Sequence, residues 1–261
     1  RIVMTLGREV STKGSTFTIR RFRDEPFTPV DLLEFKTFSS MQIAFFWLAM
    51  QYGMSMLFVG GTASGKTTSL NACSLFLLWQ HKIVSIEETR ELNLPHPNWI
   101  PGCTRQGFGG ESGGSGEKAA GEVDMYDLLR AALRERPEYI IVGEIRGAEA
   151  YVLFQAMATG HTTYSTFHAD SIQSLVHRLE NKPIEIPRVL IPALDGISIQ
   201  IQTRVGGKRV RRNKAIVEII GIDPHSHDVQ TPAIKASNSS VYPEGAWSLG
   251  VSGKGVNIAV V

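Results

Sequence analysis

The chain has 261 residues, of which 43% are hydrophobic and 20% charged, and its formal net charge is +2. This length fits one large domain, or one domain with a fragment of another. A charge so close to zero gives no general electrostatic reason to expect nucleic acid or anionic lipid as the main partner, and the two cysteines, Cys73 and Cys103, form neither a disulfide framework nor a CxxC zinc motif.

The first residues of the chain alternate in two short runs, Ile2–Leu6 and Phe17–Phe22. This pattern predicts a β-hairpin, which alone buries too little surface to be a domain. Because the chain begins at Arg1 inside a strand-like pattern, we interpret residues 1–23 as the last strands of a truncated amino-terminal α/β domain. Residues 24–30 contain two prolines and are interpreted as a linker.

A helical pattern follows from Val30 to Gly53, with Ser39 or Ser40 as a possible N-cap. Its most apolar run, Ile43–Met50, is far shorter than the ~20 residues of a membrane span. We recognise no signal peptide, and two reduced thiols fit a cytosolic compartment.

The apolar run Met56–Val59 predicts a buried strand, and it leads directly into the glycine-rich sequence GGTASGKTTS. Gly60, Gly65, Lys66 and Thr67 match G-x-x-x-x-G-K-T, and a helical pattern begins at Lys66 and continues to about Trp79. Backbone N–H groups, the helix N-terminus and the lysine attract a polyphosphate, and the threonine hydroxyl suits Mg²⁺. The segment therefore predicts a nucleoside triphosphate site formed by Gly60, Gly61, Thr62, Ala63, Ser64, Gly65, Lys66, Thr67 and Thr68.

Strand and helix patterns alternate beyond this loop. This alternation predicts a mostly parallel sheet that is covered on both faces. The expected strands are Ile83–Ile86, Tyr139–Val142 and Thr162–Phe167, and the expected helices are Val123–Arg136, Ala148–Ala158 and Ser171–Leu179. We expect irregular structure at Pro95–Pro101 and a flexible glycine-rich loop between Gln106 and Glu122.

Two long antiparallel strands are expected at Ile197–Val205 and Lys208–Ile222, joined at Gly206-Gly207. This hairpin is strongly basic, which is consistent either with an edge kept soluble by charge or with a docking surface for an acidic partner. Its basic residues are Arg204, Lys208, Arg209, Arg211, Arg212 and Lys214. Residues 231–261 show little periodicity and receive no assignment.

Acidic residues follow two of the expected strands. Glu87 and Glu88 end one strand, and Gly143-Glu144 ends the next. In a parallel sheet these ends lie at the edge that carries the phosphate-binding loop, so we expect the carboxylates near the γ-phosphate and Mg²⁺. Gly143 stands where an aspartate is usual, which leaves Glu144 as that strand's carboxylate and Glu87 or Glu88 as the base that activates water.

Histidines and arginines supply further candidates. His161 and His168 flank one strand near its two ends, so a shared metal is not expected. Each is either a structural histidine or a hydrogen-bonding sensor that reaches the γ-phosphate or a neighbouring subunit. Arg130 and Arg134 lie four residues apart on one helix face and are candidates for a cation acting in trans. The other arginines available for this role are Arg1, Arg8, Arg90 and Arg146.

Four segments together resemble the secretion ATPases of type II and type IV secretion and type IV pilus assembly. GGTASGKTTS, SIEETREL, IIVGEIRGAEA and TGHTTYSTFHADS are similar to the Walker A motif, Asp box, aspartate-less Walker B motif and His box, in that order. TLGREVSTKGSTFTIRRF, EETRELNLPHPNWI and VGGKRVRRNKAIVEI resemble the archaeal branch, whose members drive adhesive pili, the archaellum or protein export. The resemblance extends from about Arg1 to Asp228.

This resemblance implies a RecA-like P-loop ATPase domain over residues 31–230. It also implies a cytoplasmic homohexamer that docks on a polytopic membrane platform protein and hydrolyses ATP with Mg²⁺. Lys66 and Thr67 would hold phosphate and metal, Glu87 would activate water, and Glu144 would support metal or water. His161 and His168 would couple nucleotide state to domain motion, and Arg1, or alternatively Arg8, would reach the γ-phosphate.

The leading hypothesis is thus an ATPase that powers secretion or filament assembly. One alternative is a P-loop module that senses nucleotide with little hydrolysis. Another is a RecA-like nucleic-acid translocase, which the near-neutral charge disfavours, so that no nucleic-acid partner is expected. The tetracysteine zinc motif of many bacterial members is absent from this sequence.

Overall fold

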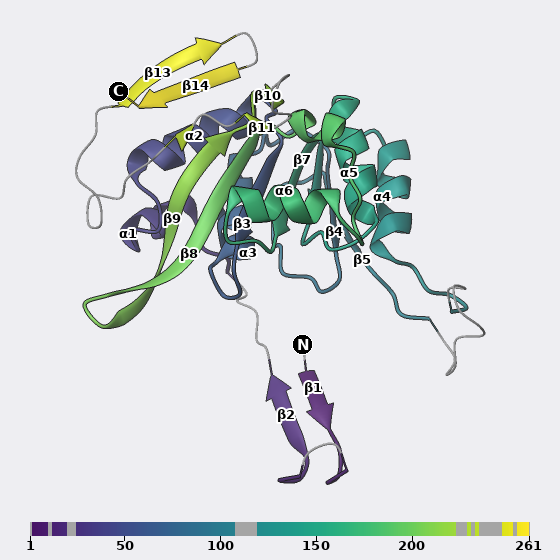
Figure 1. Cartoon of the computed structure of the whole chain (residues 1–261). Coiled ribbons are helices and arrows are strands. Elements are labelled where there is room, and N and C mark those ends of the chain that lie inside the picture. The colour runs from purple at the N-terminus through teal and green to yellow at the C-terminus, as the bar shows by residue number, and fades with distance from the viewer. Residues whose placement is uncertain are drawn as a thin grey trace.

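A computed structural model describes residues 2–9, 12–19, 25–107, 119–222, 229–230, 233–234, 247–252 and 255–260. In these residues the central feature is an eight-stranded sheet with the order β12-β9-β8-β3-β7-β6-β4-β5 (Figure 1). Its strands are β3 (Met56–Gly60), β4 (Ile83–Glu87), β5 (Trp99–Cys103), β6 (Tyr139–Val142), β7 (Thr162–Phe167), β8 (Gly196–Val205), β9 (Lys208–Glu218) and β12 (Ala233–Ile234).

The strands from β8 to β5 run parallel to one another, whereas β9 is antiparallel to β8 and β12 is antiparallel to β9. The predicted mostly parallel α/β sheet with an antiparallel hairpin is therefore confirmed. At the hairpin turn, Gly206 and Gly207 have φ values of +56° and +78°. Such positive values suit a tight turn between long strands and favour glycine at both positions.

Helices cover both faces of the sheet (Figure 1). Alternate residues of β3 explain this arrangement, because Leu57 and Val59 pack into one apolar cluster, and Met56 and Phe58 into another. One cluster includes residues of α4 (Met125–Arg134), α5 (Glu149–Ala158), α6 (Ile172–Glu180) and the short helix η2 (Arg188–Ala193); the other includes residues of α1 (Pro29–Glu34), α2 (Ser40–Gln51), α3 (Lys66–Cys73) and η1 (Ser74–Phe76). No helix among the described residues combines the length and apolar character needed to cross a membrane.

Four expected elements differ from the structure. The helical segment Val30–Gly53 is two helices, because Lys36 has a φ of +56° and Ser39 forms a new capping box with Gln42. The helix expected to run to about Trp79 ends at Cys73 and continues only as the short η1.

A further correction concerns the segment Pro95–Pro101, which was expected to be irregular but contains the first residues of β5, Trp99–Pro101. β5 lies at the edge of the sheet, where a proline without an N–H group is tolerated. The expected strand Lys208–Ile222 is also interrupted: β9 ends at Glu218, and β10 (Gly221–Ile222) pairs with β11 (Val229–Gln230).

Two smaller hairpins complete the described chain. The predicted amino-terminal hairpin is confirmed as β1 (Ile2–Thr5) paired with β2 (Thr16–Ile19), while its membership of a truncated domain stays a prediction. Near the carboxyl terminus, β13 (Trp247–Ser252) pairs with β14 (Gly255–Val260). The expected flexible loop falls mainly on residues 108–118, which lie outside the described residues, as does Arg1.

Candidate active site

The glycine-rich loop connects the buried strand β3 to α3 and has a tightly constrained backbone. A Cβ placed on Gly60 would lie 2.3 Å from the carbonyl oxygen of Gln200 in β8, so glycine is required there. Ala63 and Gly65 have φ values of +58° and +98°. A positive φ is costly for alanine, and such strain is found where the surrounding structure holds a loop in a functional shape.

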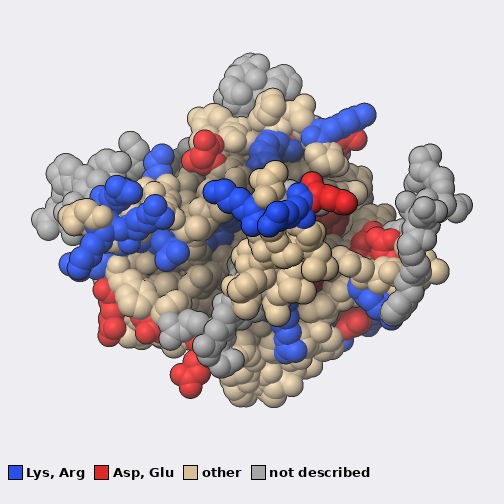
Figure 2. All heavy atoms as spheres, turned by 90° about the horizontal axis from the view of Figure 1, so that it is seen from below, with Lys and Arg blue, Asp and Glu red and all other residues tan. Residues whose placement is uncertain are grey.

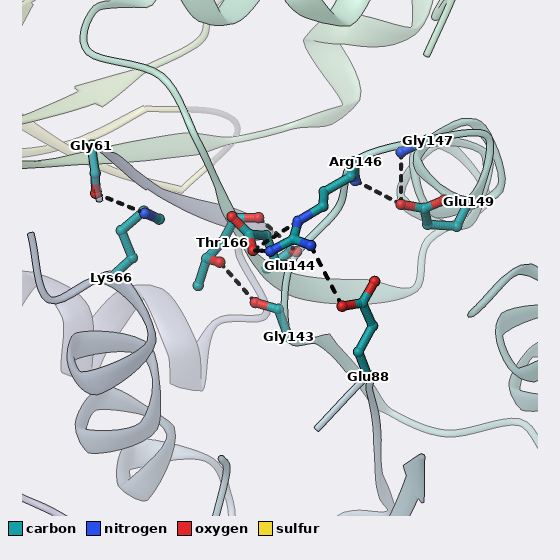
Figure 3. Close-up of polar contacts among 10 residues, drawn as sticks. Gly61, Lys66, Glu88, Gly143, Glu144, Arg146, Gly147, Glu149 and Thr166 are labelled. Atoms are coloured by element: carbon teal, nitrogen blue, oxygen red, sulfur yellow. Dashed lines mark hydrogen bonds and ion pairs between the residues drawn. The ribbon is translucent and has the colours of Figure 1, made fainter. Parts of the chain in front are cut away.

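Lys66 is the first residue of α3 and bends back over the loop. Its Nζ donates a hydrogen bond of 2.9 Å to the carbonyl oxygen of Gly61 (Figure 3). Burial lowers the pKa of the Lys66 ammonium, Glu144 opposes this effect, and Arg146 adds to it. Because the desolvated ammonium lacks enough compensating negative charge, the site favours an anionic ligand.

Glu87 is the last residue of β4 and only 2% exposed. Its Oε1 accepts hydrogen bonds from the backbone N–H groups of Glu91 and Leu92, at 2.9 Å and 3.0 Å. Its Oε2 is buried and accepts no hydrogen bond from the described residues. Burial raises the pKa of Glu87 and outweighs the two hydrogen bonds, which act in the opposite direction.

The segment after β6 is held by a hydrogen bond across the sheet and by ion pairs. Thr166 of β7 donates through Oγ1 to the carbonyl oxygen of Gly143 at 2.8 Å. The Arg146 guanidinium pairs closely with Glu144 and lies 3.5 Å from a carboxylate oxygen of Glu88 (Figure 3). Arg146 therefore lies between carboxylates that follow two neighbouring strands.

These groups surround a cavity of about 680 Å³. The phosphate-binding loop forms one wall, and the segments after β4, β6 and β7 form another. The lining residues are Phe27, Thr62, Ala63, Ser64, Gly65, Lys66, Thr67, Thr68, Glu87, Glu88, Thr89, Glu91, Gly143, Glu144, Arg146, Thr166, His168 and Arg211. The structure thus brings the loop together with the carboxylates of both strand ends.

The other candidates lie elsewhere. His161 precedes the opposite end of β7, where its Nδ1 is 3.5 Å from the hydroxyl of Thr159. Arg130 and Arg134 are exposed on α4, and the Arg130 guanidinium lies over the ring of Tyr126. None of these three residues lines the cavity.

Several lining residues were not among the candidates for the nucleotide site, and two of them, Arg211 and Phe27, come from segments that the sequence did not connect with it. Arg211 belongs to the basic hairpin and donates from Nε to the carbonyl oxygen of Ala63 at 2.9 Å. Figure 2 shows Lys and Arg side chains gathered on one side of the face that it draws. Phe27 belongs to the segment expected to be a linker. No local sequence pattern assigns either residue to the nucleotide site, because both reach the loop only through the packing of β9 and α1 beside it.

The fold and this cavity define a RecA-like P-loop NTPase. Residues 8–234 match the family model described as type II/IV secretion system protein, and the chain therefore belongs to that family.

Relatives agree with this membership. The chain is 47% identical to the uncharacterized protein MJ1287 of Methanocaldococcus jannaschii over 77% of its own length and 72% of the relative. It is 44% identical to MJ0900 of the same organism over 90% of its length, but spans only 41% of that relative. With the type IV secretion system protein PtlH of Bordetella pertussis the identity is 34%, over 64% of this chain and 51% of the relative.

Solved structures share the fold. The VirB11 ATPase of the Brucella suis type IV secretion system, in complex with sulphate, matches with a TM-score of 0.55 and 25% identity, over 80% of this chain and 62% of that one. The pilus retraction motor PilT with bound ADP matches with a TM-score of 0.54 and 22% identity, over 83% of this chain and 62% of that one.

Proposed function

We propose that this chain binds and hydrolyses ATP as the motor domain of a secretion or filament-assembly system. One observation carries the proposal: the phosphate-binding loop and Lys66 face Glu87 and Glu144 across a single cavity at the carboxyl ends of β3, β4 and β6. Cations on one wall bind the phosphates, and carboxylates on the other are placed to act on the γ-phosphate.

The loop would bind the β- and γ-phosphates through its backbone N–H groups, the N-terminus of α3 and Lys66. An arriving polyphosphate supplies the negative charge that the desolvated ammonium of Lys66 lacks. Lys66 can then exchange its hydrogen bond to the Gly61 carbonyl for one to a phosphate oxygen.

Glu87 would be the base that orients and activates water. Its Oε1 is fixed by two backbone N–H groups, and its buried Oε2 is the atom left to accept a proton. The raised pKa of Glu87 makes it a better proton acceptor than an exposed carboxylate. Glu88 is the weaker candidate, because it is exposed and lies next to Arg146.

The residues present fit Mg²⁺. Among the described residues, no group of three or more His, Cys, Asp or Glu side chains is arranged to hold a metal ion, but Mg²⁺ in phosphoryl-transfer sites uses one or two side chains together with phosphates and water. Thr67 and Glu144, which both line the cavity, would hold it, with Glu87 as the third candidate. When bound, Mg²⁺ neutralises charge that develops on the phosphate oxygens.

We further propose that the protein acts as a homohexameric ring at the cytoplasmic face of a membrane, docked on a polytopic platform protein. Family membership supports this assembly, as does the similarity to a type IV secretion system protein. The work would be protein secretion or the assembly of a type IV pilus or archaellum-like filament.

ATP binding and phosphate release from this chain test the proposal. Lys66→Ala should lose ATP binding, whereas Glu87→Gln should retain ATP and lose turnover by roughly a hundredfold or more. Arg209→Ala in the hairpin is a control for loss of an exposed cation. Undiminished hydrolysis by Lys66→Ala would exclude this site, and ATP binding without turnover in the unmodified chain would favour a nucleotide sensor.

A further inference from the structure

Thr166 belongs to β7, which lies between β3 with its phosphate-binding loop and β6, the strand that leads to Glu144. Its side chain lines the nucleotide cavity, although the residue is only 1% exposed. The pairing of the two strands places Ser165 opposite Val142, the last residue of β6. Thr166 therefore lies beside the point at which β6 ends and the segment with Glu144 begins.

Thr166 makes two hydrogen bonds to this segment, one on each side of Glu144. Its Oγ1 donates to the carbonyl oxygen of Gly143 at 2.8 Å (Figure 3), and its backbone carbonyl oxygen accepts from the N–H group of Ile145 at 3.2 Å. Any residue at position 166 could make the second bond, whereas the first requires a hydroxyl. The Thr166 side chain thus fixes the orientation of the peptide group that joins Gly143 to Glu144.

Gly143 is also tied to the strand that ends in Glu87. Its N–H group donates to the carbonyl oxygen of Ile86 at 2.8 Å, and a Cβ built on Gly143 would lie 3.1 Å from Cγ of Glu87. A displacement of Gly143 would therefore reach both carboxylates, because Glu144 follows it in the chain and Glu87 packs against it.

We propose that Thr166 is a positioning residue for ATP hydrolysis, whose hydroxyl holds Gly143 and thereby keeps Glu144 and Glu87 in place beside the γ-phosphate. This inference rests on the proposed function. A carbonyl group that loses its donor turns toward other partners, because an unpaired polar group in the interior is unfavourable. Small displacements of catalytic groups lower turnover strongly, so a single neutral hydrogen bond behind the carboxylates is sufficient to affect the reaction.

The test separates the hydroxyl of Thr166 from the rest of the side chain. Thr166→Val replaces only the hydroxyl by a methyl group, and Thr166→Ser keeps the hydroxyl and removes the methyl group. Thr166→Val should lower kcat about tenfold and leave the dissociation constant for ATP within about twofold of the wild type, because Lys66 and the loop are untouched. Thr166→Ser should retain most of the turnover, and Thr166→Ala should behave as Thr166→Val does.

Thr163→Val is the matched control on the same strand. Thr163 is fully buried, and its Oγ1 has no hydrogen-bond partner among the described residues. The same substitution therefore removes no hydrogen bond there, and both turnover and ATP affinity should equal those of the wild type. Its urea midpoint should be equal to or higher than that of the wild type, because valine carries no unsatisfied hydroxyl.

A double-mutant cycle with Gly143→Ala tests whether Thr166 acts through Gly143. If it does, adding Thr166→Val to Gly143→Ala should lower kcat by less than about twofold, although Thr166→Val alone lowers it about tenfold. Two losses that multiply would mean that the hydroxyl acts on the reaction by another route, and would overturn the proposal.

The remaining outcomes separate this inference from the proposed function. If the wild-type chain does not hydrolyse ATP, the proposed function fails, and the positioning role fails with it. If the wild-type chain hydrolyses ATP, the function stands, and the positioning role is overturned by undiminished turnover in Thr166→Val, by an equal loss in Thr166→Ser, or by a parallel loss of ATP affinity. Urea unfolding of each variant without nucleotide identifies a loss of turnover that comes from unfolding.

Discussion

Gly143 packs directly against the side chain of Glu87: a Cβ built on Gly143 would lie 3.1 Å from Cγ of Glu87 and 3.6 Å from its Cβ. The sequence shows glycine where many P-loop proteins carry an aspartate after this strand, and this contact gives the physical reason. A Cβ at position 143 would press on Cγ of Glu87, so the side chain that carries the carboxylate would have to shift by a few tenths of an ångström. The carboxylate at the end of β4 and the glycine that follows β6 therefore depend on one another.

Gly143→Ala and Gly143→Asp should consequently disturb the Glu87 carboxylate. We expect turnover to fall about tenfold in the alanine variant and further in the aspartate variant, because small displacements of a catalytic group are costly. ATP affinity should change little, since Lys66 and the loop are untouched. Steady-state hydrolysis and ATP titration measure the two effects. Gly221→Ala is the control, because an added Cβ there meets no atom within 4 Å. Undiminished turnover in Gly143→Asp would contradict the proposed role of Glu87.

Burial of Glu87 should appear in the pH dependence of stability. Its folded-state pKa is raised, so its contribution favours the folded state below the unfolded pKa and is lost as pH rises through the folded value. Glu87→Gln does not titrate. We therefore expect this variant to have a higher unfolding midpoint than the wild type at pH 7, and the difference to shrink as pH falls toward about 4. Urea unfolding at several pH values, without nucleotide, measures it. A difference that is independent of pH would contradict the burial argument.

Local patterns in the sequence predicted much of this molecule. The strands Tyr139–Val142 and Thr162–Phe167 were predicted with their observed bounds. A short apolar run between turn residues is typical of a buried strand in an α/β chain. Glu87, Glu144 and Lys66 converge as predicted, since parallel strand ends share one edge.

Long-range packing accounts for what the sequence did not predict. β5 contains a proline, and only its position at the edge of the sheet makes that acceptable. The contact of Arg211 with Ala63 joins residues 148 positions apart, and nothing near either residue indicates the other. The two histidines looked equivalent in sequence, but the direction of β7 brings only His168 to the cavity.

This difference between the histidines gives a prediction. His168→Ala should lower ATP turnover by roughly tenfold or more, because the side chain lines the cavity beside Thr166 and Glu144. His161→Ala should leave the ATP affinity of the chain unchanged, because His161 lies at the other end of the strand. Hydrolysis and ATP binding are measured for both variants at equal protein concentration. Unchanged turnover in His168→Ala, or a loss of ATP affinity in His161→Ala, would show that the position along β7 does not decide the role.

Gly60 and Gly61 are neighbours in the loop, but only Gly61 has room for a side chain. A Cβ on Gly60 would lie 2.3 Å from the Gln200 carbonyl oxygen and 2.6 Å from the Ser64 hydroxyl, whereas one on Gly61 would meet no atom within 4 Å. Gly60→Ala must push β3 and β8 apart at the centre of the sheet, so we expect a loss of about 2 kcal/mol or more in the free energy of unfolding.

Gly61→Ala is the matched control for this prediction. Its backbone is not in the left-handed region, so alanine adds no strain, and stability should stay within ~0.5 kcal/mol of the wild type. Chemical denaturation without nucleotide measures the free energy of unfolding of both variants. Because no ligand is present, effects on ligand binding do not enter the comparison. Equal stability of Gly60→Ala and Gly61→Ala would mean that the close approach of β8 to the loop does not constrain Gly60. A loss confined to Gly60→Ala would show that β8, the first strand of the basic hairpin, helps to fix the shape of the phosphate-binding loop.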